Sequence, residues 1–96
     1  MSEGAAEPEP QIEFDPRKDQ ENLRKHGIPL RRAVDMVLLN PPLVDDRFAY
    51  GEVRYRGYGK IDDDYYVLAF TIRGGRLRAI SLRAMSKKER ARYAIT

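Results

Sequence analysis

Four strand-like runs follow one another through the second half of the chain, and they constrain the fold more than any other feature. The runs are Leu43–Phe48, Glu52–Tyr58, Tyr65–Ile72 and Arg76–Ala84. Only short segments containing glycine separate them, and connections this short join neighbouring antiparallel strands. The sequence therefore predicts an antiparallel sheet of about four strands. We expect Tyr65–Ile72 to be a central strand, because it is apolar on both of its alternating sides.

The first part of the chain predicts a short N-terminal strand and two helices. Ile12–Phe14 alternates apolar and polar residues and suits a strand. Asp15 and Pro16 are typical of an N-cap and a first helical position, and residues 25–27 are typical of a helix end that closes on glycine. A second helix is indicated by an apolar stripe that ends at residues 40–42, Asn-Pro-Pro. The stripe consists of Leu30, Ala33, Val34, Val37 and Leu38.

A third helix is predicted at the C-terminal end, where Ser86 and Glu89 have the spacing of a capping box and the helix runs to about Tyr93. The fold class is therefore α+β, with helices covering one face of the sheet and the opposite face open. Period-2 alternation predicts the residues of that open face. They are Glu52, Arg54, Arg56 and Tyr58 from one strand and Leu77, Ala79, Ser81 and Arg83 from the last. The alternate set of the last strand is more apolar and is predicted for the core: Arg78, Ile80, Leu82 and Ala84.

Length and composition exclude several classes of protein. A chain of 96 residues holds one domain with a modest core, so no large buried cofactor cavity is expected. The absence of cysteine excludes disulfides, thiolate metal sites and cysteine nucleophiles. Residues 1–10 predict a disordered acidic leader before a single domain over residues 11–96. That leader does not have the pattern of a signal peptide, and no run is long enough to span a membrane, so we expect a cytoplasmic protein.

The distribution of charge indicates more than the net charge, which is only +3. Residues 73–92 are rich in lysine and arginine and contain a single acid, Glu89. This pattern favours a polyanionic partner. No helix-turn-helix pattern stands out, so contact with DNA is expected only through another protein.

Several separated motifs, in one order along the chain, resemble the BrnT family of toxins. They are Phe14-Asp15, Lys18, Asn22, Lys25-His26-Gly27, Gly51-Glu52, Arg54, Arg78, Ile80-Ser81, Arg83-Ala84, Glu89 and Tyr93. The resemblance implies a RelE-like fold and a ribonuclease toxin of a type II toxin–antitoxin system that inhibits translation and needs no metal or other cofactor. It also implies neutralisation by a BrnA-type antitoxin, which itself contacts operator DNA. Pro16 and the acidic leader depart from the family pattern.

Metal-free RNA cleavage needs help for the attacking 2′-hydroxyl, charge stabilisation at the phosphate and a proton for the departing 5′-oxygen. Arginine suits the second task, because its planar fork holds two phosphate oxygens while it stays charged. Arg83 is the best candidate for this task. Contacts to the RNA backbone are predicted for Arg54, Arg56 and Arg78.

The candidates for proton transfer also have structural interpretations. His26 is the natural general acid or base, with Lys25 stabilising charge beside it. Both residues equally suit the end of a helix, and the capping interpretation is favoured for His26. Glu52 could act as a base if it lies near Arg54 and Arg83, or it could form a surface ion pair, which is the favoured interpretation.

The remaining candidates stay open between RNA contact and structure. Lys18, Asn22 and Lys25 share one helical face, which either approaches the phosphate path or is simply solvated. Glu89 is explained by the capping box, and Tyr93 either stacks on a base or packs on the sheet. Basic residues of the last helix contact either phosphates or an acidic antitoxin: Lys87, Lys88, Arg90 and Arg92. The alternative function is a noncatalytic RNA-binding or antitoxin-binding module on the same scaffold.

Overall fold

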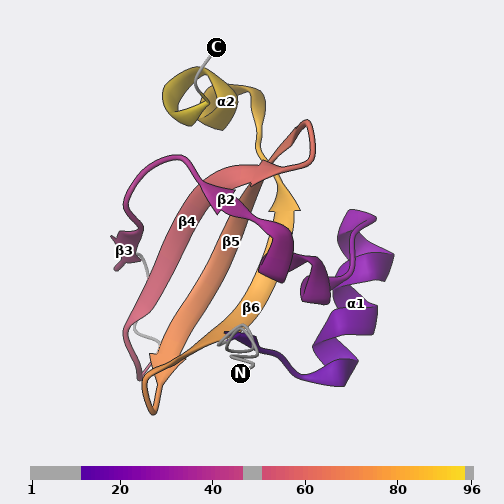
Figure 1. Ribbon diagram of the computed structural model, residues 1–96, viewed down its shortest axis with the longest axis vertical. Helices are drawn as coiled ribbons and strands as arrows, with labels where there is room; N and C mark the ends of the chain where they lie inside the picture. Colours follow the sequence, from indigo (N-terminus) through magenta and orange to yellow (C-terminus); the bar gives the residue numbers. More distant parts are fainter. Residues whose placement is uncertain (1–11, 47–50, 95–96) are drawn as a thin grey trace, which may run out of the picture.

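The computed structural model describes residues 12–46 and 51–94, and it is an α+β fold as predicted (Figure 1). The predicted leader, residues 1–10, lies outside the described residues, as does the end of the predicted strand beyond residue 46. The elements in chain order are β1 (Ile12–Glu13), α1 (Pro16–His26), the 3-10 helix η1 (Leu30–Asp35), β2 (Val37–Leu38), β3 (Leu43–Asp45), β4 (Arg54–Ile61), β5 (Asp64–Arg73), β6 (Arg76–Ala84) and α2 (Lys87–Tyr93).

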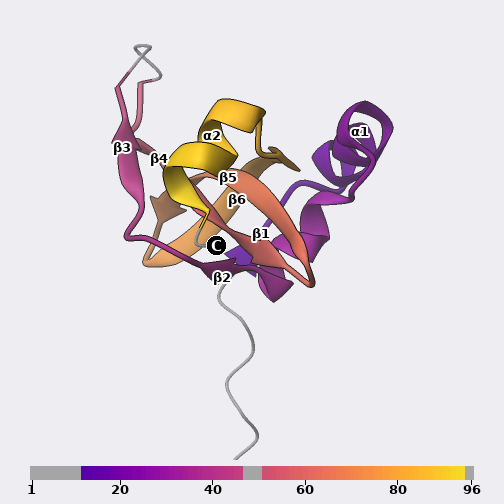
Figure 2. The ribbon, with the colours of Figure 1, turned by 90° about the horizontal axis from the view of Figure 1, so that it is seen from above.

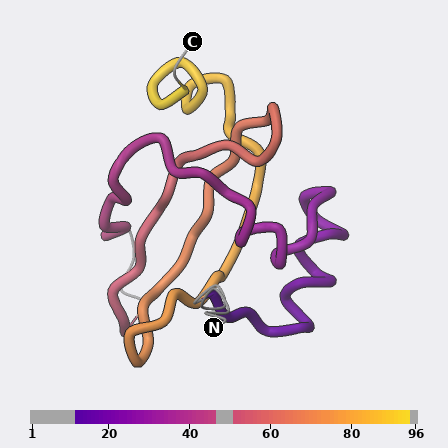
Figure 3. Tube along the Cα trace, viewed as in Figure 1, coloured from indigo at the N-terminus to yellow at the C-terminus, as the bar shows by residue number. Residues whose placement is uncertain are grey.

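The sheet has the order β1-β6-β5-β4-β2, and β3 also pairs with β4. The pairs β4–β5 and β5–β6 form the predicted antiparallel meander, and β5 is the central strand that its two-sided apolar pattern predicts. β1 is parallel to β6 and is the only described strand that departs from the antiparallel arrangement. Figure 3 shows how the chain leaves β2, loops outward and returns beside β4 as β3.

The prediction of a second helix over the stripe from Leu30 to Leu38 is wrong. The chain forms only the short η1 and then becomes extended at Met36, so that β2 pairs with β4. Pairing brings the backbone of Val37 so close to Gly59 that a side chain at Gly59 would collide with the Val37 carbonyl. β-branched residues fit a strand, and backbone pairing with β4 outweighs the helical pattern of so short a stripe.

The helices do not all cover one face of the sheet, which corrects a second prediction (Figures 1 and 2). The 3-10 helix η1 supplies Leu30 and Ala33 to the main core, together with residues of β4, β5 and β6. By contrast, α1 lies along the edge of β6. The short α2 packs on the opposite face at one end of the sheet, where Tyr93 contacts a smaller cluster around Tyr58 and Val67. Most of that opposite face therefore stays uncovered by the described helices.

Asn22 fastens α1 to the edge of β6. Its side-chain amide donates to the carbonyl of Leu82 at 2.7 Å and accepts from the amide of Leu82 at 3.0 Å. The same amide nitrogen donates to the carbonyl of Ile28 at 2.8 Å. Asn22 is buried and continues the hydrogen bonding of the sheet where β1 has ended. The predicted caps of α1 are present, with the Asp15 side chain accepting from Arg17 and Gly27 at a φ of 75°.

A β-bulge divides β6 and overturns the predicted alternation of this strand. Ala69 pairs with Ser81 and Phe70 pairs with Ala79, so Ile80 is an extra residue on β6. Before the bulge, Leu77 and Ala79 face the main core, although the alternation predicts them for the open side. After the bulge, Leu82 faces the main core, as predicted. Arg78 and Ile80 belong to the open side, and Ala84 is exposed at the strand end, so these three are not core residues. In a regular strand, residues an odd number of positions apart point to opposite faces. Because of the bulge, Arg78 and Arg83 lie on the same face although their separation is odd.

Candidate functional site

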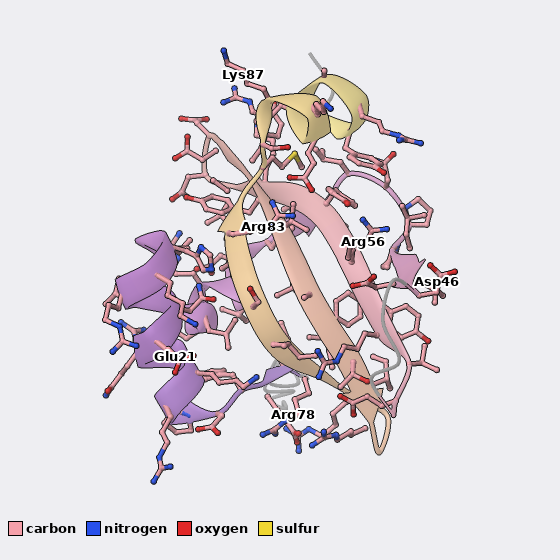
Figure 4. The ribbon with its side chains drawn as sticks, turned by 180° about the vertical axis from the view of Figure 1, so that it is seen from behind. Glu21, Asp46, Arg56, Arg78, Arg83 and Lys87 are labelled. Atoms are coloured by element: carbon pink, nitrogen blue, oxygen red, sulfur yellow. The ribbon has the colours of Figure 1, made fainter. Side chains whose placement is uncertain are left out.

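We call the side of the sheet away from the main core the open face, and Figure 4 views the molecule from that side. It carries three shallow, connected hollows that we name after one residue of each. The Arg83 hollow is lined by Asp45, Arg54, Arg56, Val67, Ala69, Ile80, Ser81 and Arg83. The Arg78 hollow is lined by Asp15, Lys18, Glu52, Arg54, Thr71, Arg73, Arg78, Ala79 and Ile80. The His26 hollow is lined by Lys18, Glu21, Asn22, Lys25, His26, Ile80 and Ser81.

Shared residues join the three hollows into one surface. Ile80, the extra residue of the bulge, lines all three. Arg54 is common to the Arg83 and Arg78 hollows, and Lys18 is common to the Arg78 and His26 hollows. Figure 4 shows Arg56 and Arg83 toward the α2 end of the sheet and Arg78 at the opposite end. The sequence thus correctly anticipates an uncovered, cationic sheet face.

Arginines surround a floor of small side chains in the Arg83 hollow. Ala69 and Ser81 are neighbours across β5 and β6 and leave room above the sheet. Arg56 donates from Nη1 to the hydroxyl of Tyr58 at 3.0 Å, and its Nε is buried without a hydrogen-bond partner among the described residues. Three arginines, Arg54, Arg56 and Arg83, line this hollow, and guanidinium groups pair with anions, so the hollow is suited to an anion.

Arg83 is held at the rim of this hollow by Glu89 of α2. Its Nη1 donates to Glu89 Oε1 at 2.7 Å, and its Nη2 donates to Oε2 at 2.9 Å. Oε1 also accepts from the backbone amide of Ser86 at 2.9 Å, so the predicted capping box is confirmed. The hydrogen bonds from Arg83 are the main cause that lowers the pKa of Glu89 to about 2. The sequence indicated the cap but not this contact with Arg83.

Tyr93 packs on Tyr58, with ring centroids 3.8 Å apart and planes 18° apart. Tyr58 is buried, and burial is the main cause that raises the pKa of its hydroxyl. The packing alternative for Tyr93 therefore describes its position, and one side of its ring is covered by protein. A direct stacking contact with a base stays a prediction.

Ion pairs dominate the Arg78 hollow. Glu52 accepts from Arg73 Nη2 at 3.0 Å, and its other oxygen lies 3.5 Å from Arg54 Nε. Arg73 is the main cause that lowers the pKa of Glu52, which makes this carboxylate a weaker base. Glu52 does not line the Arg83 hollow, so the structure does not bring it together with Arg83. Arg78 lies 3.7 Å from a carboxylate oxygen of Glu13 on β1.

α1 provides most of the lining of the His26 hollow, including Lys18 near its start and Lys25 and His26 in its last turn. His26 and Lys25 are exposed at the helix end, directly before the Gly27 cap. Lys25 also lies 3.5 Å from Glu21 one turn earlier. His26 and Arg83 do not line a common hollow, but their two hollows meet at Ile80 and Ser81.

Comparison with known families decides what kind of protein carries this face. The model of a family described as the ribonuclease toxin BrnT of type II toxin–antitoxin systems matches residues 14–89. The chain belongs to the BrnT toxin family. Membership implies an RNA substrate and an antitoxin partner. No curated protein and no solved structure matches the chain, so the RelE-like assignment stays a prediction from resemblance.

The match to the BrnT family covers the three hollows and stops at Glu89. It therefore includes the pair Arg83–Glu89 but not Tyr93. In the described parts of this BrnT-family chain, no helix is long and apolar enough to cross a membrane. Neither do the described residues contain a group of three or more His, Asp or Glu side chains placed to hold a metal ion.

Sequence reasoning missed Asp45 as a residue of the site. Asp45 lies on β3 opposite Arg54, is 5% exposed and lines the Arg83 hollow. In the sequence it is the first of two consecutive aspartates. A signal was present, since Asp45 interrupts a run that otherwise has the pattern of a strand. Which of the two aspartates turns inward depends on the register of β3 on β4.

Proposed function

We propose that this BrnT-family chain cleaves RNA without a metal ion and that the scissile phosphate binds in the Arg83 hollow. The observation that carries the proposal is the convergence of Arg54, Arg56 and Arg83, from two different strands, around the small floor at Ala69 and Ser81. Guanidinium groups match the oxygens of a phosphodiester and remain charged throughout the reaction.

The reaction is an attack by the 2′-hydroxyl oxygen of one nucleotide on its own 3′-phosphorus. The new bond from the 2′-oxygen to phosphorus forms while the bond from phosphorus to the 5′-oxygen of the next nucleotide breaks. The hydroxyl proton passes to a base, and the 5′-oxygen takes up a proton from an acid. The products are a 2′,3′-cyclic phosphate and a 5′-hydroxyl, and no water or cofactor is consumed.

Arg83 has the central role in this proposal. Negative charge accumulates on the phosphate oxygens in the transition state, and preorganised donors aimed at that charge lower the barrier. Arg83 is fixed by Glu89 and lines the hollow, and Arg56, held by its bond to Tyr58, lines the hollow beside it. We assign both groups to the scissile phosphate, with Arg54 supporting them from the rim shared with the Arg78 hollow.

Proton transfer is assigned to His26, with Lys25 stabilising charge next to it. The His26 hollow meets the Arg83 hollow at Ser81, so a ribose bound between them would be within reach of both. Glu52 is not assigned to this step, because it pairs with Arg73 in the Arg78 hollow and has a lowered pKa. The capping role of His26 and its proton transfer are compatible, since the cap uses the helix backbone.

The flanking RNA backbone is assigned to the Arg78 hollow, where Arg78 and Lys18 supply positive charge. Asn22 has its side chain engaged with β6, so its contribution is to hold α1 in place. The proposal also includes a BrnA-type antitoxin as partner and inhibition of translation as the outcome in the cell. Co-purification with the product of the adjacent gene tests the partner.

The test of the reaction is cleavage of an oligoribonucleotide in the presence of EDTA by wild type, Arg83→Ala and His26→Ala. All three proteins are first verified as folded by circular dichroism. The proposal expects multiple turnovers by the wild type and strong losses in both variants. Intact RNA in every reaction, with and without ribosomes, would contradict it.

One observation favours the alternative of a noncatalytic RNA-binding module. Glu89 already neutralises Arg83, and an arginine engaged in this way attracts phosphate less strongly than a solvated one. Tight, salt-sensitive RNA binding by the wild type without products supports the alternative. Multiple turnover eliminates it.

A further inference from the structure

The pair of Arg83 and Glu89 differs from every other ion pair described on the open face. Both of its hydrogen bonds are short, at 2.7 and 2.9 Å, and the Glu89 side chain is only 18% exposed. Glu52 pairs with Arg54 and Arg73, and Arg78 pairs with Glu13. In these pairs the distances from nitrogen to oxygen are 3.0 to 3.7 Å. A two-point contact between planar groups fixes orientation as well as distance.

The contact with Glu89 is one of two that fix the Arg83 guanidinium. It donates twice to Glu89 and once, from Nη1, to the carbonyl of Ala84. Arg83 lines the hollow together with Arg56, and its guanidinium is held by Glu89 of α2. Glu89 therefore occupies one edge of the group and sets the direction of the rest.

A second route connects α2 with the other arginine of this hollow. Tyr93 stacks on Tyr58, and the hydroxyl of Tyr58 accepts the hydrogen bond from Arg56. Arg83 is thus held by α2 directly and Arg56 is held through Tyr58. Two residues of one short helix, Glu89 and Tyr93, therefore influence the positions of both guanidinium groups.

We propose that α2 is a positioning element for RNA cleavage, in which Glu89 orients Arg83 and the Tyr93–Tyr58 stack orients Arg56. This inference rests on the proposed function of the Arg83 hollow. Glu89 is a positioning residue and not a general base, because a carboxylate whose pKa is about 2 accepts a proton poorly at neutral pH. The contact with Arg83 also goes beyond what a cap requires, because the capping box needs only the two hydrogen bonds between Ser86 and Glu89.

The main test compares wild type with Glu89→Gln, which keeps the capping box because glutamine serves at that position as well. We expect kcat to fall by about 10-fold to 100-fold, because a displacement of about 1 Å at a reacting centre has effects of this size. KM should change much less, and the shape of the pH–rate profile should be unchanged. Asp35→Asn is the control, because it removes an ion pair with Arg32 on η1, away from the open face.

A double-mutant cycle separates positioning from general destabilisation. If Glu89 acts through Arg83, then Glu89→Gln costs little further activity in the Arg83→Ala background. Loss of stability alone would lower the residual rate equally in both backgrounds and would overturn the inference. If Arg83→Ala matched the wild type, the proposed function itself would be wrong, which is a separate outcome.

Tyr58→Phe tests the second route. This variant keeps the stacked ring and removes the hydroxyl that accepts from Arg56. A fall in kcat with little change in thermal stability supports positioning through Tyr58, and unchanged kcat overturns that half of the inference.

Side-chain ¹⁵N NMR of the arginines gives a readout that does not depend on activity. We expect separate Nη signals for Arg83 in the wild type, because the bond to Glu89 slows rotation of the group, and averaged signals in Glu89→Gln. Faster cleavage by Glu89→Gln than by wild type would show that the carboxylate blocks the arginine and would contradict positioning.

Discussion

The two ends of the open face contain the same kinds of residues but organise them differently. In the Arg83 hollow, one arginine is fixed by a two-point contact to a largely buried carboxylate, and a second donates to the buried Tyr58. In the Arg78 hollow, arginines share Glu52 and Glu13 through longer and more exposed contacts. Fixed donors suit a transition state, whereas adjustable charges suit binding of a flexible backbone. This difference supports the proposal that chemistry takes place at one end and substrate binding at the other.

The difference arises from elements outside the three long strands. The Arg83 hollow lies beside α2, whose capping box fixes Glu89, and beside β3, which supplies Asp45. The Arg78 hollow lies beside the two-residue strand β1 and the start of α1. The bulge at Ile80 connects the two ends by keeping Arg78 and Arg83 on one side of the same strand.

The largest expected effect is on Arg83. Arg83→Ala should lower kcat by about 10²-fold to 10³-fold, the usual cost of removing one preorganised donor to transition-state charge. Single-turnover cleavage measures this directly. A loss no greater than that of Arg78→Ala would erase the proposed difference between the two ends.

The next effect concerns proton transfer from the edge of the face. His26→Gln should lower kcat by about 10²-fold, the lower range for loss of a general acid or base, and should remove one limb of the pH–rate profile. Arg24→Gln is the matched control, since Arg24 is in the same last turn and does not line the hollow. An unchanged pH profile in His26→Gln would leave only the capping role.

A smaller and different effect is expected at the binding end. Arg78→Ala should raise KM by several-fold while kcat stays near that of wild type. The slope of log affinity against log salt should fall by about 0.7, the value for one phosphate contact on a single strand. Titration of a noncleavable 2′-deoxy oligonucleotide at several salt concentrations measures it. A fall in kcat with an unchanged salt slope would place Arg78 in the chemistry instead.

The smallest effect is on stability in acid. The folded pKa of Glu89, about 2, lies below its ordinary value of 4.5. Its contribution to stability is therefore present above about pH 4.5 and is lost as the pH falls toward 2. Between pH 7 and pH 3 the wild type should lose about 1 kcal/mol more than Glu89→Gln, a value reduced for screening of a partly exposed pair. Urea unfolding at both pH values measures the difference, and equal losses would show that the pair contributes nothing.

Local signals predicted much of this fold correctly. The caps at Asp15, Gly27 and Ser86, the strand Arg76–Ala84 and the central position of β5 all follow from short-range chemistry. The second helix failed because pairing of Val37 and Leu38 with β4 is a tertiary interaction that the apolar stripe does not reveal.

The site was predictable in kind but not in arrangement. Alternation correctly placed Arg54, Arg56 and Tyr58 on one side of β4, because that strand is regular. It failed in the first half of β6, because the bulge inserts one residue that the sequence does not announce. The partnership of Arg83 and Glu89 depends on where α2 folds back onto the sheet, and this follows from packing of Tyr93 on Tyr58.

Analysis of the RNA ends produced in EDTA by wild type and Arg83→Ala tests the central claim most directly. The account predicts that wild type generates a 2′,3′-cyclic phosphate and a 5′-hydroxyl, that one 2′-deoxy nucleotide abolishes cleavage at its 3′ side, and that Arg83→Ala yields about a hundredth of the product or less. Equal products from the two proteins, or cleavage at the 2′-deoxy position, would contradict it.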